Sequence, residues 1–253
     1  AWPVTLRLEP LADDEVEELI AQRVPEQLRE RIARAAGGNP LFIEEMLAMA
    51  GDREGEVVVP PTLQALLAAR LDQLEPAERS VLECAAIEGE IFHRGAVQAL
   101  APEGTTVTPH LAALVRKELI RPNRPQLAGE DGFRFRHLLI RDAAYDALPK
   151  AARAELHARL ASWLERHGSE LVELDEIMGY HLEQASRYRD ELGLPTDEEL
   201  TAAARRRLTA AGFRAYLRQD YGAAVSLLER AAGLVPTAEL DLALETELID
   251  ALY

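Results

Sequence analysis

Cysteine is nearly absent from the 253-residue sequence, which contains only Cys84. One cysteine cannot form a disulfide within the chain, and its apolar neighbours predict a small buried thiol. The chain also has no apolar run of the roughly 20 residues that a transmembrane helix needs. Its first residues lack the basic-then-apolar order of a secretion signal. These absences predict a cytoplasmic protein in a reducing compartment.

Positive charge is scarce as well. Lys and Arg together number 28 against 44 Asp and Glu, which gives a formal net charge of -16 at pH 7. Phosphate backbones and anionic membrane surfaces repel such an acidic chain. The sequence therefore predicts no direct DNA binding and no membrane binding, and it favours proteins as partners.

The residue patterns of common catalytic and metal sites are also missing. The chain has no His-Glu-x-x-His motif, no cysteine pair and no Gly-x-Ser-x-Gly motif. Adjacent acids such as Glu44-Glu45 are predicted to lie on solvated helix faces. His181 near Glu183 offers two ligands without a third, which is typical of a structural histidine. We expect no catalytic residue, no metal site and no enzymatic activity of this segment by itself.

The sequence is rich in residues that form helices. It is 48% hydrophobic and 28% charged, with only 5% aromatic residues, and its content of Ala, Leu, Glu and Arg is typical of a helical protein. A chain of this length can hold two or three small domains, each with a core. The predicted fold class is mainly α.

The stretch GGNPLF at residues 37–42 lies between two helical patterns. Either glycine can adopt the left-handed conformation that ends a helix, Asn39 can cap the next helix, and Pro40 suits its first position. The new helix would then begin with free N–H groups on Leu41 and Phe42, which can meet a phosphate, a base edge or water. A plain helix-turn-helix corner is the alternative.

Four stretches in order, LxPLxxxE, GGNPLFIEEML, VPPTLQALLAARLDQL and FRFRHLLIRDAAYDAL, carry a resemblance to a known family over roughly residues 5 to 165. This order resembles the signal-transduction ATPases of the STAND class, which are related to AAA+ proteins. It is similar to the ATPase regions of LuxR-type transcriptional regulators and of multidomain adenylate and guanylate cyclases. The resemblance implies that Asn39 and Pro40 lie in a helical lid and contact the nucleotide, with Pro40 near the adenine.

The phosphate-binding loop of that family, G-x-x-x-x-G-K-[ST], has no counterpart, because the chain contains no Gly-Lys pair. It also lacks an apolar strand ending in paired acids for magnesium. Residues 2–6 resemble the last strand of the nucleotide-binding core, so the sequence is interpreted as a fragment C-terminal to that core. The resemblance implies no cofactor in the fragment, with ATP or ADP and Mg bound only together with the core, and no ATP hydrolysis by the fragment alone.

His137 follows the extended residues 133–136 and is predicted to begin a helix. In the resembled family a Met-His-Asp motif at this corner places its histidine against the terminal phosphate in the closed, ADP-bound state. The order here is similar, but position 138 is Leu rather than Asp. The alternative is a histidine that caps its own helix or pairs with a nearby acid.

Composition shifts and turn signals predict the domain organisation. Residues 62–148 contain three helical patterns, at 77–88, 94–100 and 106–118, and an extended pair at 119–121 and 133–136, which together predict a winged helix with a largely buried third helix. Arg70 is expected in a salt bridge or on a solvated face. The predicted divisions are 1–50, the end of the nucleotide-binding core and the helical lid; 51–61, a linker; 62–148, the winged helix; 149–190, a helical arm; and 191–253, tetratricopeptide-like (TPR-like) repeats.

The last predicted domain depends on small and large residues at the spacing of a TPR motif. Leu240, Leu244 and Leu248 predict the first helix of a second repeat, and the run at 205–207, three arginines, is expected on a solvated helix face. The positions that match the motif are Gly212, Ala215, Ala224, Leu228, Ala231 and Pro236.

The sequence is compatible with two functions. The first is a regulatory lid, winged-helix and TPR-like segment of a STAND-type ATPase that controls its nucleotide state and an output domain, either transcriptional regulation or a nucleotide cyclase. Its partners would be its own nucleotide-binding core, the output domain, and a protein partner or inducer at the TPR-like arm. The alternative is a helical TPR-like protein-interaction scaffold that binds no nucleotide.

Overall fold

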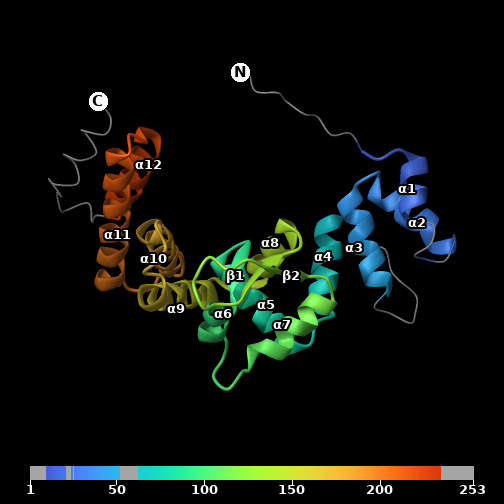
Figure 1. Ribbon diagram of the computed structural model, residues 1–253, viewed down its shortest axis with the longest axis horizontal. Coiled ribbons are helices and arrows are strands. Elements are labelled where there is room, and N and C mark those ends of the chain that lie inside the picture. The colour runs from blue at the N-terminus through green and yellow to red at the C-terminus, as the bar shows by residue number, and fades with distance from the viewer. Residues whose placement is uncertain (1–9, 21–23, 25, 52–61, 235–253) are drawn as a thin grey trace.

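The computed structural model describes residues 10–20, 24, 26–51 and 62–234. These residues form twelve helices and one three-stranded antiparallel sheet, so the chain is mainly α as predicted. Three bodies follow one another along the molecule (Figure 1): α1 to α3 at one end, a winged helix in the middle and α9 to α12 at the other end. No helix in the described ranges combines the length and the apolar character needed to cross a membrane.

The first body, here called the lid, consists of α1 (Asp13–Ile20), α2 (Glu26–Ala36) and α3 (Pro40–Gly51). The apolar faces of the three helices meet in one core, with Val16 and Ile20 from α1, Ile32 from α2 and Phe42 and Met46 from α3. The strand expected at residues 2–6 and residues 52–61 of the expected linker lie outside the described residues.

Helix α4 (Leu63–Asp72) connects the lid to the winged helix. Thr62 caps it by accepting a hydrogen bond from the backbone N–H of Ala65 at 3.1 Å, which fixes the helix start. Leu66 belongs to the lid core, whereas Leu67 and Leu71 belong to the winged-helix core. One helix thus contributes to two cores.

The winged helix contains α5 (Pro76–Glu88), β1 (Ile91–His93), α6 (Arg94–Leu100), α7 (Val107–Arg116), β2 (Ile120–Asn123) and β3 (Gly132–Phe135). The sheet order is β1-β3-β2. The predicted hairpin is present, with Ile120 opposite Phe135. Strand β1 was not predicted. It is only three residues long and is held by a distant partner, since Phe92 lies opposite Phe133.

The prediction that the third helix of the winged helix, α7, is largely buried is wrong, because only one face of it is buried. Leu111 and Leu114 lie in the core, while Ala112 and Arg116 are exposed. The reason is geometric: α5, α6 and β2 pack on α7 and bury the face that carries Leu111 and Leu114.

Helix α8 (Leu138–Ala147) is likewise buried on one face only, the face that packs on the winged helix. Ile140 and Ala144 pack there, on α5, but Leu138 is 53% exposed and Leu139 is 42% exposed. Ile140 and Ala144 define the buried face of α8, and Leu138 and Leu139, in the first turn, project away from that face.

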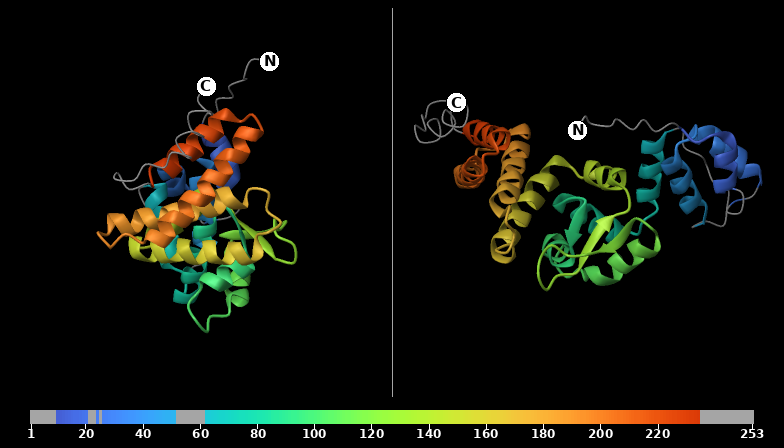
Figure 2. Two further views of the ribbon diagram at one scale, coloured as in Figure 1. Left: turned by 90° about the vertical axis from the view of Figure 1, so that its left-hand side faces the viewer. Right: turned by 45° about the horizontal axis from the view of Figure 1, so that its top comes forward.

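The third body consists of α9 (Lys150–His167), α10 (Leu174–Glu191), α11 (Glu198–Leu217) and α12 (Tyr221–Ala232), and each helix packs on the next (Figure 2). Helix α9 also shares the winged-helix core through Leu160 and Trp163. Close helix approach needs small residues: a Cβ on Gly212 would lie 2.8 Å from Leu228 Cγ. Gly212 is thus a small residue at which α11 and α12 approach closely, whereas Pro236 and the helix expected at 240–248 lie outside the described residues.

Cys84 is buried, as the sequence predicted. Burial raises the pKa of its thiol to about 12, so the sulfur stays protonated and inert at neutral pH.

Candidate functional site: the lid interface

The corner at residues 37–40 has the predicted geometry. Gly37 and Gly38 have φ values of 54° and 74°, and α3 begins at Pro40. Gly38 packs directly on the residues before α1: a Cβ there would lie 2.6 Å from the carbonyl oxygen of Leu11, whose N–H donates to Gly38 at 2.9 Å. Glycine is required at position 38 by both its φ and this contact.

The expectation of free N–H groups at this corner is wrong. The side-chain oxygen of Asn39 accepts from the backbone N–H of Leu41 at 3.0 Å and from that of Phe42 at 3.3 Å. A residue that caps a helix uses the same N–H groups that an anion would need. Asn39 and Pro40 are exposed, so this corner presents to a ligand a proline ring and the remaining amide group of Asn39.

His137 precedes α8 and lies against α3 of the lid. Its Nε2 is 3.4 Å from a carboxylate oxygen of Glu44 and 4.0 Å from one of Glu45. It makes no capping hydrogen bond to its own helix, so of the alternatives left open, pairing with a nearby acid is the one observed. Glu44 is four residues, or about one helical turn, after Pro40. The structure therefore brings the three predicted residues, Asn39, Pro40 and His137, to the first turns of one helix.

Around His137 lies a charged network that joins the lid to the winged helix. Arg70 of α4 is 5% exposed and forms an ion pair with the buried carboxylate of Glu45. Its other terminal nitrogen donates to the backbone carbonyl of Lys117 at 2.7 Å. We call this set, Glu44, Glu45, Arg70, Glu78, Lys117 and His137, the lid interface. Arg70 is thus in a salt bridge, as predicted, but not on a solvated face.

Glu78 of the lid interface is ionised at neutral pH. Lys117 Nζ donates to a carboxylate oxygen of Glu78 at 2.7 Å, and the N–H of Glu75 donates to the same oxygen at 3.1 Å. Burial by itself would raise the pKa of Glu78, but these hydrogen bonds and the charge of Lys117 lower it below its usual value. A buried charge needs such a partner, because an unpaired ion in a protein interior is costly.

A second polar group, which the sequence did not reveal, joins α8, α9 and α10. His157 and His181 face each other with their Nδ1 atoms 2.8 Å apart. The hydroxyl of Tyr145 lies 2.9 Å from His157 Nε2 and 3.0 Å from the hydroxyl of Tyr188, which accepts from Arg153 at 3.3 Å. We call these five residues the histidine cluster.

Both histidines of the cluster are neutral. Burial, with a smaller contribution from His181, lowers the pKa of His157 to about 2. Burial also lowers the pKa of His181 to about 3. The prediction of a satisfied structural His181 is confirmed, although its partner is His157, while Glu183 pairs with Arg230. The helical spacing of His157 with Leu160 and Leu164 was a signal for its buried position.

Comparison with known proteins gives three findings. A family model described as a domain of unknown function, DUF8739, matches residues 12–54, which contain α1 to α3. A protein of Rhizobium meliloti (strain 1021) described as uncharacterised is 30% identical over 203 residues, which are 73% of this chain and 20% of that protein. The chain thus spans about a fifth of the length of this relative.

The third finding is a solved structure from Pyrococcus horikoshii, a signal transduction ATPase with numerous domains (STAND) that has a tetratricopeptide repeat sensor. It is similar to 94% of this chain, with 37% of its own length covered, 15% sequence identity and a TM-score of 0.46.

Proposed function

We propose that this chain is the regulatory segment of a STAND-type signal-transduction ATPase, in which the lid, the winged helix and the helical arm control the nucleotide state of a nucleotide-binding core. Through that state they would control an output domain, either in transcriptional regulation or a nucleotide cyclase. The proposal is supported by one observation above all: His137 of the winged helix meets the helix that begins at Asn39 and Pro40. Residues implied as nucleotide contacts from two different modules therefore converge.

The residues present fit a nucleotide in part. His137 Nε2 is buried and makes no hydrogen bond to the described residues, but the carboxylates of Glu44 and Glu45 lie 3.4 and 4.0 Å from it, so a phosphate oxygen that bound it would take the place of Glu44. Arg70 already neutralises Glu45. Glu44, whose side chain is 45% exposed, carries a charge that repels phosphate. No residue of the described part forms a cluster suited to a metal ion, and Mg would come with the nucleotide-binding core.

The test uses the natural full-length protein with its bound ADP. His137→Ala should weaken ADP binding about tenfold to a hundredfold and raise basal output, because one charge-assisted hydrogen bond contributes about 1.5–3 kcal/mol. Glu44→Gln should act in the opposite direction by removing the repulsive charge. His167→Ala is the matched control, since that imidazole bonds only within α9, to the carbonyl of Trp163. Unchanged ADP affinity and output in the His137→Ala protein would refute the role of His137.

The alternative, a protein-interaction scaffold, is favoured by apolar residues on the arm. Phe213, Leu217 and Tyr221, at the junction of α11 and α12, are all exposed. Large exposed apolar groups close together are typical of protein contact surfaces. A full-length protein that binds neither ATP nor ADP but still binds a protein partner through this arm would favour the scaffold.

Neither function uses the winged helix to bind DNA. The exposed face of α7 includes Arg116 and Ala112, which offers little to base edges, and the chain has a net charge of -16. We expect no salt-dependent association with duplex DNA in a mobility assay at physiological ionic strength. Tight binding there would contradict this expectation.

A further inference from the structure

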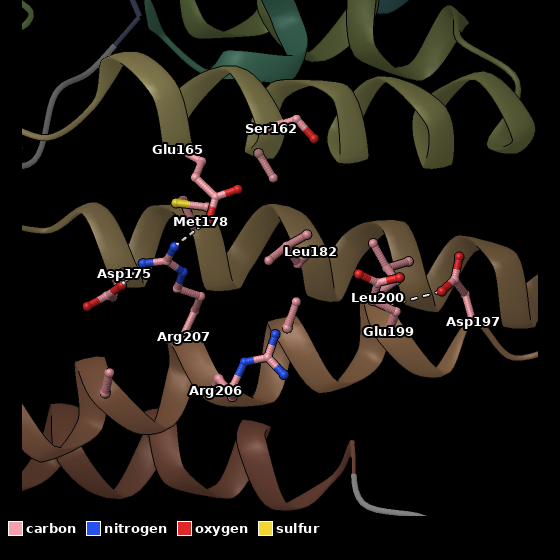
Figure 3. A pocket seen from close by; sticks show the side chains of 13 residues that line it. Ser162, Glu165, Asp175, Met178, Leu182, Asp197, Glu199, Leu200, Arg206 and Arg207 are labelled. Carbon is pink, nitrogen blue, oxygen red and sulfur yellow. Dashed lines mark hydrogen bonds and ion pairs between the residues drawn. The ribbon is translucent and has the colours of Figure 1, made fainter.

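A groove of about 700 Å³ runs between α9 and α11 over the surface of α10 (Figure 3). Its floor is apolar and includes Met178 and Leu182 of α10 and Ala161 of α9. The wall formed by α11 has small residues at Ala203 and Ala210. A groove of this volume is in the range of small-ligand sites, and small side chains in its wall leave room for the backbone of a bound chain.

The charges at one end of the groove are already paired. Arg207 donates to Asp175 at 2.6 Å and to Glu165 at 2.9 Å, and Arg214 donates to the other oxygen of Asp175 at 2.5 Å. This corrects part of the sequence prediction, because Arg207 of the arginine run at 205–207 lies in an ion-pair network rather than on a solvated face. These residues have little electrostatic attraction left for a ligand.

Two other charges lining the groove are unpaired within the described part of the chain. Arg206 is exposed at the middle of the groove and forms no ion pair, and Glu199 is exposed near the end where α11 begins. Asp197, beside Glu199, caps α11 by accepting from the N–H of Leu200 at 3.1 Å. Since Arg206 and Glu199 are seven residues apart in one helix, they are about 10.5 Å apart along its axis.

We propose that this groove binds a short peptide in the polyproline II conformation that carries a carboxylate side chain for Arg206 and, three residues away, a cationic side chain for Glu199. Three residues make one polyproline II turn of about 9 Å, which puts both side chains on the same side of the peptide at close to the separation of the two charges. The apolar floor would contact the side chains between them. This inference deepens the proposed function, because it names the chemistry that the helical arm recognises.

The experiment measures binding to the natural full-length protein by fluorescence anisotropy, without nucleotide. The probes are four fluorescein-labelled, C-amidated tetrapeptides with two central leucines: Lys-Leu-Leu-Glu, Gln-Leu-Leu-Glu, Lys-Leu-Leu-Gln and Gln-Leu-Leu-Gln. We expect saturable binding, tightest for the first peptide and weakest for the last. Either end of the peptide can face Arg206, so the design does not depend on its direction.

Two variants identify the contacts. Arg206→Gln should weaken binding of the Glu-containing peptides about tenfold, as expected for one charge-assisted contact, and remove their advantage over the Gln peptides. Glu199→Gln should remove the advantage of the Lys peptides alone. Arg116→Gln, which makes the same charge change on the exposed face of α7, is the control and should change nothing. Since all three side chains are exposed, the variants should unfold at the temperature of the parent protein.

The proposal is overturned if none of the peptides binds saturably, if the neutral peptide binds as well as the doubly charged one, or if Arg206→Gln leaves the order of affinities unchanged. Because nucleotide is absent, failure here leaves the ADP test of the proposed function untouched. If instead the ADP test fails, the anisotropy measurements still decide whether the groove binds the peptides.

Discussion

The lid interface and the histidine cluster both fix one body of the molecule to the winged helix, but with opposite chemistry. The lid interface uses full charges, such as Arg70 with Glu45 and Lys117 with Glu78. The histidine cluster centres on neutral groups, with His157 hydrogen-bonded to both His181 and Tyr145, and Arg153 is its one charged member. Separated charges can be stabilised by water or by another ion, whereas the buried neutral imidazoles have only other members of the cluster as partners.

The surroundings of the two regions strengthen this contrast. The histidine cluster lies beside an apolar core shared by α9 and the winged helix, to which Leu160 and Trp163 belong. At the lid interface, Glu44 and Lys117 reach solvent. We infer that the lid can separate from the winged helix, whereas the arm and the winged helix move as one unit.

The largest effect should follow from breaking the buried ion pair. Glu45→Ala leaves the guanidinium of Arg70 buried without its carboxylate and should lower the free energy of unfolding by about 3–5 kcal/mol, measured by urea denaturation. The double variant Glu45→Leu with Arg70→Met should recover most of this loss, because it removes both charges and keeps the volume. A loss from Glu45→Ala as small as that of a surface pair would show that the lid interface is hydrated.

Acid should act on the histidine cluster first. The pKa values of His157 and His181 are lowered from 6.5 in the folded protein, so the unfolded chain binds more protons below that pH. Their stabilisation is complete above pH 6.5 and is lost as the pH falls, by about 2 kcal/mol for each histidine at pH 5. Urea denaturation at pH 7, 6 and 5 measures the slope.

Glu78 of the lid interface should respond only in stronger acid. The pKa of Glu78 is lowered from 4.5, so its contribution to stability is present above that pH and is lost as the pH falls below it.

Replacing both His157 and His181 with Gln should flatten the dependence of the unfolding free energy on pH between pH 6.5 and 5, while His167→Gln should not. An unaltered slope in the double variant would mean that other groups cause it.

A smaller loss is expected from Tyr145→Phe. The change removes the hydroxyl that lies between His157 and Tyr188 and leaves buried polar atoms unpaired, at a cost of about 1–3 kcal/mol. Tyr180→Phe is the matched control, because that hydroxyl makes no hydrogen bond to the described residues and the side chain is partly exposed. Equal stability of the two variants would argue that the cluster contributes little.

The smallest effect is that of salt. At about 1 M NaCl the screening length falls to about 3 Å, and the partly exposed pairs of the lid interface should weaken by less than about 1 kcal/mol. Hydrogen exchange should then speed up in α3 and α4 and stay constant in α9 and α10. Faster exchange in both pairs of helices would contradict the proposed difference between the two regions.

The sequence predicted elements better than it predicted the contacts between them. The helix expected at 94–100 has those bounds in the structure, because local spacing of apolar residues determines a helix face. Glu45 and Arg70 are 25 residues apart, and His157 and His181 are 24 apart. Such pairs depend on how helices meet in space, which periodicity within one helix does not specify.

At the candidate site, too, the sequence predicted the local structure but not the contacts between bodies. The cap at Asn39 and the start of α3 at Pro40 followed from residue types. The contact between His137 and Glu44 did not, because it joins two bodies whose relative position is set by α4. The free N–H groups expected at Leu41 and Phe42 were wrong for a local reason: an asparagine suited to cap a helix takes up those donors itself.

Helix α4 also constrains how the protein can be divided or recombined. Leu66 completes the lid core, and Leu67, the next residue, completes the winged-helix core. A lid exchanged between two such proteins would bring a foreign surface for Leu66, and a winged helix expressed without the lid would carry Leu66 into solvent as a site for aggregation. A chimera should therefore take α1 to α4 from one parent, and the winged-helix residues that pack on α4 should be changed to match it. Because α4 packs in both cores, a substitution on this helix affects the lid and the winged helix together.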